Sequence, residues 1–334
     1  MQSKMDLTCY PYGYREYGGS DSKFSLLIDG EHCLVKRTEY TQPTYENSAG
    51  LVSSPVSEYV GSHIMQSLGI DTHETFLCKY HDKENRSPKE DIVVACRDFT
   101  DENYRLQHFR WFMLNMYSRN EIGRVPTYGQ LYHVMETHPV LEKITEQAIS
   151  RYWDQFIGDA LIGNPDRHKE NFGYLVNEKT GDIRLAPVYD CGSSLFPSLD
   201  EEGLEKVLSS KEEIEKRCYT FPTAALTPPG GGKTDKTGYF DFISSGYDRN
   251  CTEAFLRIYE KIDLKQINRI IDETPYISDI RKEFYKTMIV ARKELILDRS
   301  IEELLKKGAI VVDERHDRDE AEQKIGGGDE EPEL

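Results

Sequence analysis

Apolar side chains recur at helical spacing from residue 152 to residue 162, near the middle of the chain. Four of them fall on one side of that segment, as expected for a buried helix: Phe156, Ile157, Ala160 and Leu161. The helix is expected to end at Gly163-Asn164-Pro165, because Gly breaks the pattern and Pro disfavours a helical residue before it. Residues 166 to 171 are polar and predict a loop.

Two apolar runs follow this loop, residues 172–176 and 183–188, and the polar residues 177–182 join them. This pattern predicts a β-hairpin with a polar turn. The second run leads to Asp190, which is followed by Cys191-Gly192. The segment as a whole therefore predicts a helix, a polar loop, a hairpin and a second aspartate.

The polar loop contains Asp166 and, five residues later, Asn171. Enzymes of the protein-kinase type need such a set, with one Asp that accepts the proton of the substrate hydroxyl, and an Asn and a second Asp that bind Mg²⁺. Asn171 and Asp190 carry the oxygen ligands that Mg²⁺ prefers. Taken alone, the Asp–Asn pair is equally compatible with a solvated turn, so further partners upstream have to support the interpretation.

Length and composition exclude several classes of protein. The 334 residues suffice for one large or two modest domains, and a net charge of −17 argues against binding to a nucleic-acid backbone. No apolar run predicts a membrane span or the core of a signal peptide. The seven cysteines are scattered without C-x-x-C pairs, which favours reduced thiols and a cytoplasmic location, with export by a signal-free route left open.

The N-terminal part contains a hairpin signal, because apolar runs flank Asp29-Gly30. Its upstream turn includes the candidate nucleotide-binding residues Gly18, Gly19, Ser20 and Lys23. A glycine-rich turn can lay backbone N–H groups over phosphates, although an ordinary turn has the same composition. Lys36 ends the second strand, where a kinase places its phosphate-binding lysine and where a solvated lysine is also common.

A helix is predicted from Ser57 to Gly69, with Glu58 in its first turn. Glu58 could pair with Lys36 and fix its position, or simply favour the helix dipole. Strands are predicted at residues 75–80 and 92–95, so this part is expected to be a small sheet with one helix. It should end near Cys96, at the position of a kinase hinge whose backbone binds adenine.

The remainder is predicted to be mostly helical. Helices are expected at residues 104–117, 128–135, 141–162, 199–217, 252–262, 264–271 and 277–305. The Gly-Gly-Gly-Lys-Thr run at 230–234 is interpreted as a surface loop, because no strand leads into it as a phosphate-binding loop requires. Residues 313–334 are predicted to form a disordered acidic tail.

With these residues in view, the chain resembles the HipA-like kinases, the toxin family of bacterial toxin–antitoxin modules and its free-standing relatives, over roughly residues 15–300. The most specific matches are Gly163 to Phe172 and Leu185 to Asp190. The resemblance implies an α+β, two-lobed kinase fold, with an N-lobe in residues 1–100 and a helical C-lobe in 101–312. It also implies Mg-ATP as cofactor and phosphate transfer to Ser or Thr.

The same resemblance implies a role for each candidate residue. Asp166 would be the catalytic base, Asn171 and Asp190 the metal ligands, and Lys36 the phosphate contact. His168 occupies the loop histidine of the family, for which a hydrogen bond that holds the loop is favoured over proton transfer. Many members autophosphorylate a serine of the glycine-rich loop, for which Ser20 and Ser22 are the candidates here.

Partners are less defined by the resemblance. The resemblance predicts no extra domain ahead of the glycine-rich loop, where the toxin has the region that contacts its antitoxin, so an antitoxin partner is possible but not implied. The chain looks more like short stand-alone members, some of which are effectors. A Ser/Thr protein kinase with a protein substrate is the favoured hypothesis. The alternatives are a kinase acting on a lipid or small molecule, for which a basic face near Arg167 and Lys169 would be suited, and a catalytically inactive nucleotide-binding module.

Overall fold

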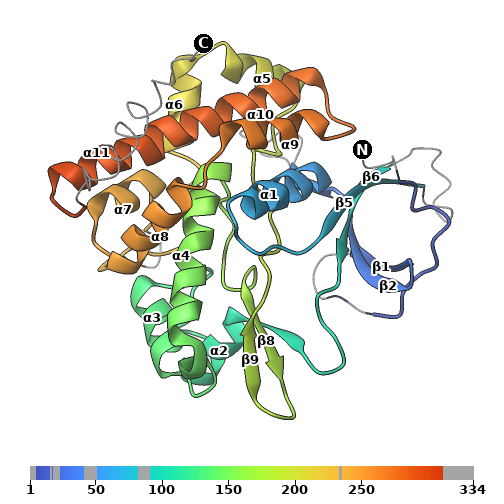
Figure 1. Cartoon of the computed structure of the whole chain (residues 1–334), viewed down its shortest axis with the longest axis horizontal. Coiled ribbons are helices and arrows are strands. Elements are labelled where there is room, and N and C mark those ends of the chain that lie inside the picture. The colour runs from blue at the N-terminus through green and yellow to red at the C-terminus, as the bar shows by residue number, and fades with distance from the viewer. Residues whose placement is uncertain are drawn as a thin grey trace, which may run out of the picture.

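An antiparallel sheet forms the N-terminal part of the molecule (Figure 1). Its strands lie in the order β1-β2-β6-β5, with bounds β1 Lys23–Ile28, β2 Glu31–Lys36, β5 Thr75–Tyr80 and β6 Asp91–Arg97. The computed structural model describes residues 5–15, 17, 23–40, 51–81, 91–232 and 235–310. The predicted glycine-rich turn at 18–22 and the predicted acidic tail at 313–334 lie outside these residues.

The turn between β1 and β2 has the predicted conformation. Asp29 and Gly30 have φ of 53° and 85°, as a two-residue hairpin turn that matches the strand twist requires. The resulting register places Lys23 opposite Lys36. The hairpin therefore brings both lysines to the same end of the sheet.

Helix α1 (Pro55–Ser67) lies between this sheet and the helical part of the molecule (Figure 1). It begins two residues before the predicted start, because the Ser54 hydroxyl caps it by accepting from the amides of Val56 and Ser57. The preceding segment was predicted to be loop throughout, but it contains two short paired strands, β3 (Glu39–Tyr40) and β4 (Leu51–Ser53).

A second sheet of the described residues has the order β7-β8-β9, with β7 Arg105–His108, β8 Gly173–Asn177 and β9 Asp182–Leu185. The β8–β9 hairpin was predicted. The helix predicted from 104 to 117 was wrong at its start, because residues 105–108 pair with β8 and only α2 (Phe109–Met116) is helical. Pairing with a strand about sixty-five residues later in the chain overrides the local pattern here.

The C-terminal part is helical, as predicted. Its helices are α3 Tyr128–Thr137, α4 Thr145–Ile162, α5 Glu201–Leu208, α6 Lys211–Tyr219, α7 Tyr239–Ser245, α8 Arg249–Tyr259, α9 Leu264–Glu273, α10 Asp279–Arg292 and α11 Arg299–Lys306. A 3₁₀ turn at Leu141–Ile144 precedes α4, and a π-helical stretch at Lys293–Asp298 joins α10 to α11. Helix α7 was not predicted, because it follows a stretch rich in Gly and Pro.

Two groups of buried apolar side chains hold these layers together. Alternate residues of β5 and β6 point to opposite faces, so that Leu77 and Val94 join the large core around α1 and α4, whereas Cys78 and Val93 join a smaller one beneath the sheet. The small sheet with one helix and the mostly helical remainder confirm the α+β, two-lobed class predicted from the sequence. Among the described residues, no helix has the length and apolarity that crossing a membrane requires.

Candidate active site

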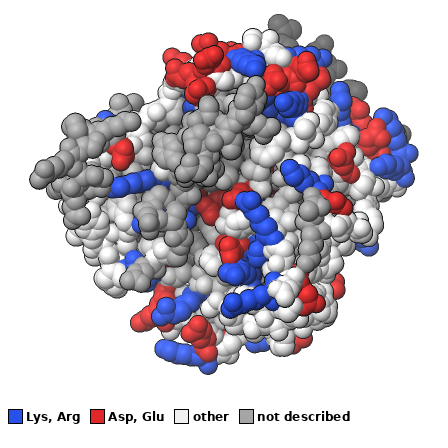
Figure 2. Space-filling view, turned by 180° about the vertical axis from the view of Figure 1, so that it is seen from behind, with Lys and Arg blue, Asp and Glu red and all other residues white. Residues whose placement is uncertain are grey.

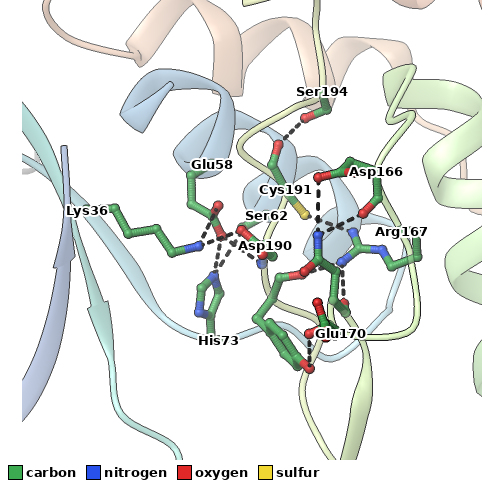
Figure 3. Close-up of polar contacts among 12 residues, drawn as sticks. Lys36, Glu58, Ser62, His73, Asp166, Arg167, Glu170, Asp190, Cys191 and Ser194 are labelled. Carbon is green, nitrogen blue, oxygen red and sulfur yellow. Dashed lines mark hydrogen bonds and ion pairs between the residues drawn. The ribbon is translucent and has the colours of Figure 1, made fainter. Parts of the chain in front are cut away.

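The side chain of Lys36 is buried at the end of β2, where α1 and the segment after β9 converge on it (Figure 3). Its Nζ donates to Glu58 Oε2 at 3.0 Å and to Asp190 Oδ1 at 2.9 Å. Burial alone would lower the pKa of Lys36, but the two carboxylates outweigh it and raise that pKa well above the usual value. Lys36 is therefore a fixed cation between two anions.

Glu58 accepts hydrogen bonds on both of its carboxylate oxygens. While Lys36 binds Oε2, Oε1 accepts from His73 Nε2 at 2.9 Å and from the backbone amide of Asp190 at 3.0 Å. Burial would raise the pKa of this carboxyl, but Lys36 and His73 hold it far below its usual range. The predicted Lys36–Glu58 pair is thus present, and His73 is a third member that the sequence did not indicate.

Close contact between α1 and the segment after β9 sets the position of Asp190. The amide of Ser54 donates to the Gly192 carbonyl at 3.0 Å, and a Cβ added at Gly61 would lie 2.7 Å from Ser194 Oγ. Asp190 itself has a φ of 62°, a left-handed conformation that Asp tolerates better than most residues. Burial would raise its pKa, but Lys36 outweighs that effect and the pKa lies below the usual value.

Asp166 and Asn171 lie together in the loop after α4, as the sequence predicted. The amide of Asp166 donates to Asn164 Oδ1 at 3.1 Å, and Asn171 Nδ2 donates to the Asp166 carbonyl at 2.7 Å. The Asp166 carboxylate is 3.2 Å from an exposed guanidinium, that of Arg124. Burial raises the pKa of Asp166, and the nearby charge of Asp190 adds to that rise.

Arg167 links the loop to α4 and to the residues around Asp190. It forms a bidentate ion pair with Asp159, at 3.0 and 3.1 Å, and Nη1 donates to the carbonyls of Asn171 and Tyr189. The remaining N–H faces Cys191 Sγ at 3.4 Å. Because all five donors are used and the side chain is buried, Arg167 cannot contribute to an exposed basic face that would suit an anionic acceptor.

His168 makes the hydrogen bond that the sequence favoured for it. Its Nδ1 accepts from the Glu170 amide at 3.2 Å, while Nε2 is 3.9 Å from Asp166 Oδ1, beyond hydrogen-bond length. Cys96 lies inside β6, paired with both Leu34 and Thr75, so the connection to the C-lobe begins only after Arg97.

The other candidate nucleotide-binding residues are only partly described. Lys23 lies opposite Lys36, and its positive charge also helps to lower the pKa of Asp190. Gly18, Gly19 and Ser20 lie outside the described residues. The segment before them is fixed by Asp98, which binds the guanidinium of Arg15 and accepts from the Tyr17 hydroxyl at 2.7 Å.

Glu58, His73 and Cys96 also form a group of metal-ligand type, with donor atoms within 4.8 Å of one another. Both oxygens of Glu58 are already bound, one by Lys36 and one by His73. Burial raises the pKa of the Cys96 thiol well above its usual value, so the thiolate that a metal requires is disfavoured. This group is therefore better suited to holding Lys36 in place through Glu58 than to binding a metal ion.

Comparison with known protein families shows that residues 16–274 of the chain match the HipA-like C-terminal domain. The chain belongs to the HipA-like family. It is 34% identical over 281 residues to the serine/threonine-protein kinase CtkA of Helicobacter pylori strain J99, covering 84% of this chain and 82% of that protein. The crystal structure of the H. pylori proinflammatory kinase CtkA superposes with a TM-score of 0.78 at 32% identity, over 91% of this chain and 99% of that one. The resemblance seen in the sequence is thus confirmed, and the protein is a HipA-like kinase.

Two buried residues of the site were missed by the sequence interpretation, His73 and Asp159. Asp159 carried a signal, because it is a charged residue within the apolar stretch of α4, where a buried carboxylate requires a cationic partner. His73 lies in a short connection between α1 and β5 and has no local pattern that distinguishes it from a surface histidine.

Proposed function

We propose that this protein is an ATP- and Mg²⁺-dependent Ser/Thr protein kinase. The observation that carries the proposal is the buried Lys36, joined to both Glu58 and Asp190, beside a loop that presents Asp166 and Asn171. Phosphoryl transfer depends mostly on positioning and on neutralising charge, and this set of residues supplies both.

In this proposal Lys36 contacts the nucleotide phosphates and Glu58 holds it in place. The donor set fits Mg²⁺: Asn171 uses its amide nitrogen to bind the loop, which leaves Oδ1 for a cation, and Lys36 takes one oxygen of Asp190. Bound Mg²⁺ would neutralise the charge that develops on the phosphates. Gly18, Gly19, Ser20 and Lys23 would cover the phosphates, and Cys96 would border the nucleotide site.

Asp166 would accept the proton of the acceptor hydroxyl. Its pKa is raised by burial, which makes it a stronger base than an exposed aspartate. Its carboxylate faces Arg124, so the acceptor has to share or replace that contact. His168 would keep the loop in shape rather than transfer a proton.

The acceptor is proposed to be Ser or Thr of a protein, because the relative CtkA is a serine/threonine-protein kinase. Autophosphorylation is proposed at Ser20 or Ser22. The chain would divide into an N-lobe of residues 1–100, a C-lobe of 101–312 and a tail of 313–334. Because the relative CtkA is a proinflammatory kinase, an effector role is proposed in preference to pairing with an antitoxin.

Intact-mass spectrometry after incubation with Mg-ATP, followed by peptide mapping, tests the proposal. Wild-type protein should gain phosphate, and Asp166→Ala should gain none while keeping its circular dichroism spectrum and its ATP binding. A gain in both proteins would refute the role of Asp166. No gain in either, with ATP bound, would favour a small-molecule or lipid acceptor, and no ATP binding would refute the kinase proposal as a whole.

A further inference from the structure

A small basic pocket lies beside the proposed catalytic loop and has no part in the chemistry described above. It has a volume of about 220 Å³ and is bounded by α2, the segment after α2 and the loop itself. Its lining residues are Arg110, Leu114, Arg119, Ile122, Lys169 and Glu170. Three of these are cations and one is an anion, so the pocket carries a net positive charge.

The positive charge is only partly compensated within the protein. Arg110 binds Glu170 at 3.0 Å, which accounts for the single carboxylate of the pocket. Within the described part of the chain no acidic side chain forms an ion pair with the exposed Arg119. Figure 2 shows Lys and Arg side chains gathered in the lower middle of one face, although the net charge of the chain is −17. The excess of positive charge in this pocket is therefore a local feature and not a result of the overall composition.

Lys169 forms the inner, buried wall of this pocket. Its Nζ donates to the backbone carbonyl of Arg124 at 2.8 Å, which fixes the ammonium without neutralising it. An anion bound in the pocket would pair with this ammonium as well as with the guanidinium of Arg119, because both side chains line the pocket.

The pocket adjoins the proposed site of phosphoryl transfer. Lys169 follows Asp166 by three residues, and Arg124 connects the two, with its carbonyl on Lys169 and its guanidinium 3.2 Å from the Asp166 carboxylate. An extended peptide advances about 3.3 Å per residue, so a residue close to the acceptor in sequence would reach the pocket.

The size of the pocket indicates what it can hold. Small-molecule sites usually measure about 300–1,000 Å³, which is larger than this pocket. The apolar walls of Leu114 and Ile122 suit the methylene groups of a side chain, and the cations suit its anionic end. From this, and resting on the proposed protein-kinase function, we infer that the pocket binds an acidic side chain of the substrate, a carboxylate or a phosphate, near the phosphorylated Ser or Thr.

Kinase assays on synthetic serine peptides test this inference. In each peptide, one position next to the serine is replaced by Ala, Asp, phosphoserine or Lys, and kcat/KM is measured for wild type and for Arg119→Gln. The matched control is Arg249→Gln, because Arg249 is an exposed arginine on α8 outside the pocket. Wild type should prefer an anion at one position by about tenfold, the size of one partly exposed charge-assisted contact. Arg119→Gln should lose most of that preference and keep its rate on the Ala peptide, and Arg249→Gln should resemble wild type.

A second measurement uses no catalysis. Fluorescence anisotropy measures binding of the same peptides with their acceptor serine replaced by Ala. For wild type, the Kd of the anionic peptide should be about tenfold lower than that of the peptide with Ala at the flanking position. For Arg119→Gln, the two Kd values should be similar. A stronger effect of phosphoserine than of Asp would identify a phosphorylated substrate, and the reverse a carboxylate.

Phosphate transfer without any anion preference, or with a preference unchanged in Arg119→Gln, would overturn the inference and leave the kinase proposal intact. Absence of transfer to every peptide and to the protein itself would count against the kinase proposal, and the anisotropy results would still decide whether the pocket binds acidic peptides.

Discussion

Removal of the Lys36 ammonium should destabilise the protein, because it would leave two carboxylates facing each other in a buried place. Lys36→Met keeps most of the apolar stem and deletes the charge. Nζ lies 3.0 Å from Glu58 Oε2 and 2.9 Å from Asp190 Oδ1, and the three side chains are 8%, 1% and 27% exposed. The variant thus breaks two ion pairs that are largely shielded from water.

The size of the effect follows from the contacts that remain. Breaking a buried ion pair by removing one partner costs about 3–5 kcal/mol. Glu58 keeps the hydrogen bonds from His73 and from the Asp190 amide, and Asp190 is partly exposed, so the lower end of the range applies. We expect a loss of about 3 kcal/mol at pH 7.5, or roughly 4 °C in Tm for a chain of 334 residues.

The loss should depend on pH in a defined direction. In the wild type both carboxyl pKa values lie below their usual values, so the stabilisation is present above the unfolded carboxyl pKa values and is lost as pH falls through the folded ones. Without Lys36, burial and mutual repulsion should raise the pKa values of Glu58 and Asp190. The carboxylates of the variant then take up protons as the pH falls, which removes their repulsion and restores part of the lost stability. The difference between the two proteins should shrink from pH 7.5 to pH 5.

Urea unfolding followed by tryptophan fluorescence at both pH values measures this, since Trp153 is fully buried. Lys211→Met is the matched control, because Lys211 is 89% exposed and its ion-pair partner within the described residues is Glu215, also on the surface of α6. That control should cost at most about 0.5 kcal/mol. The reasoning is wrong if Lys36→Met costs no more than the control, or if its cost is the same at both pH values.

Three further predictions concern the remaining parts of the site. Because burial raises the pKa of Asp166, kcat of the wild type should fall on the acid side at a pH above the ordinary aspartate pKa. Asp166→Asn should lower kcat about 10²–10⁴-fold above that pH and should lack the acid limb of the wild-type pH–rate profile. Asp98→Ala releases Arg15 and the segment before the glycine-rich turn, so ATP titrations should show a KM for ATP raised several-fold with kcat little changed. Asp159→Asn leaves the buried charge of Arg167 uncompensated and should cost about 3–5 kcal/mol in urea unfolding, whereas a loss below 1 kcal/mol would contradict the role given to this ion pair.

Much of the candidate site could be predicted from the sequence, because the chemistry restricts both residue type and order. Lys36 at a strand end, Glu58 in the next helix and Asp190 after a hairpin lie up to 154 residues apart, yet each follows from a local element that was assigned correctly. The Asp29-Gly30 turn was equally predictable, because few residues adopt two consecutive positive φ angles.

The missed features depend on contacts between distant segments. Residues 105–108 directly precede the helical pattern of α2, and only their pairing with β8 makes them a strand. His73 binds Glu58 because the bridge from Thr72 to Val188 and the contact of His73 N with the Val188 carbonyl bring that connection to the site. Neither pairing has a signature within a short window of sequence.

One peptide unit connects the two lobes of the site. The Tyr189 carbonyl accepts from Arg167, and the Asp190 amide, which belongs to the same peptide bond, donates to Glu58. Arg167 is anchored on α4 through Asp159, whereas Glu58 belongs to α1, so the peptide is held from both sides. This explains how Asp190 is kept at a φ of 62°, since rotation of the peptide would break one of two buried, charged hydrogen bonds. A shift of α1 would therefore move Asp190 in two ways, through the hydrogen bond from the Asp190 amide to Glu58 and through the ion pairs of Lys36. The orientation of Asp190 thus depends on the position of α1.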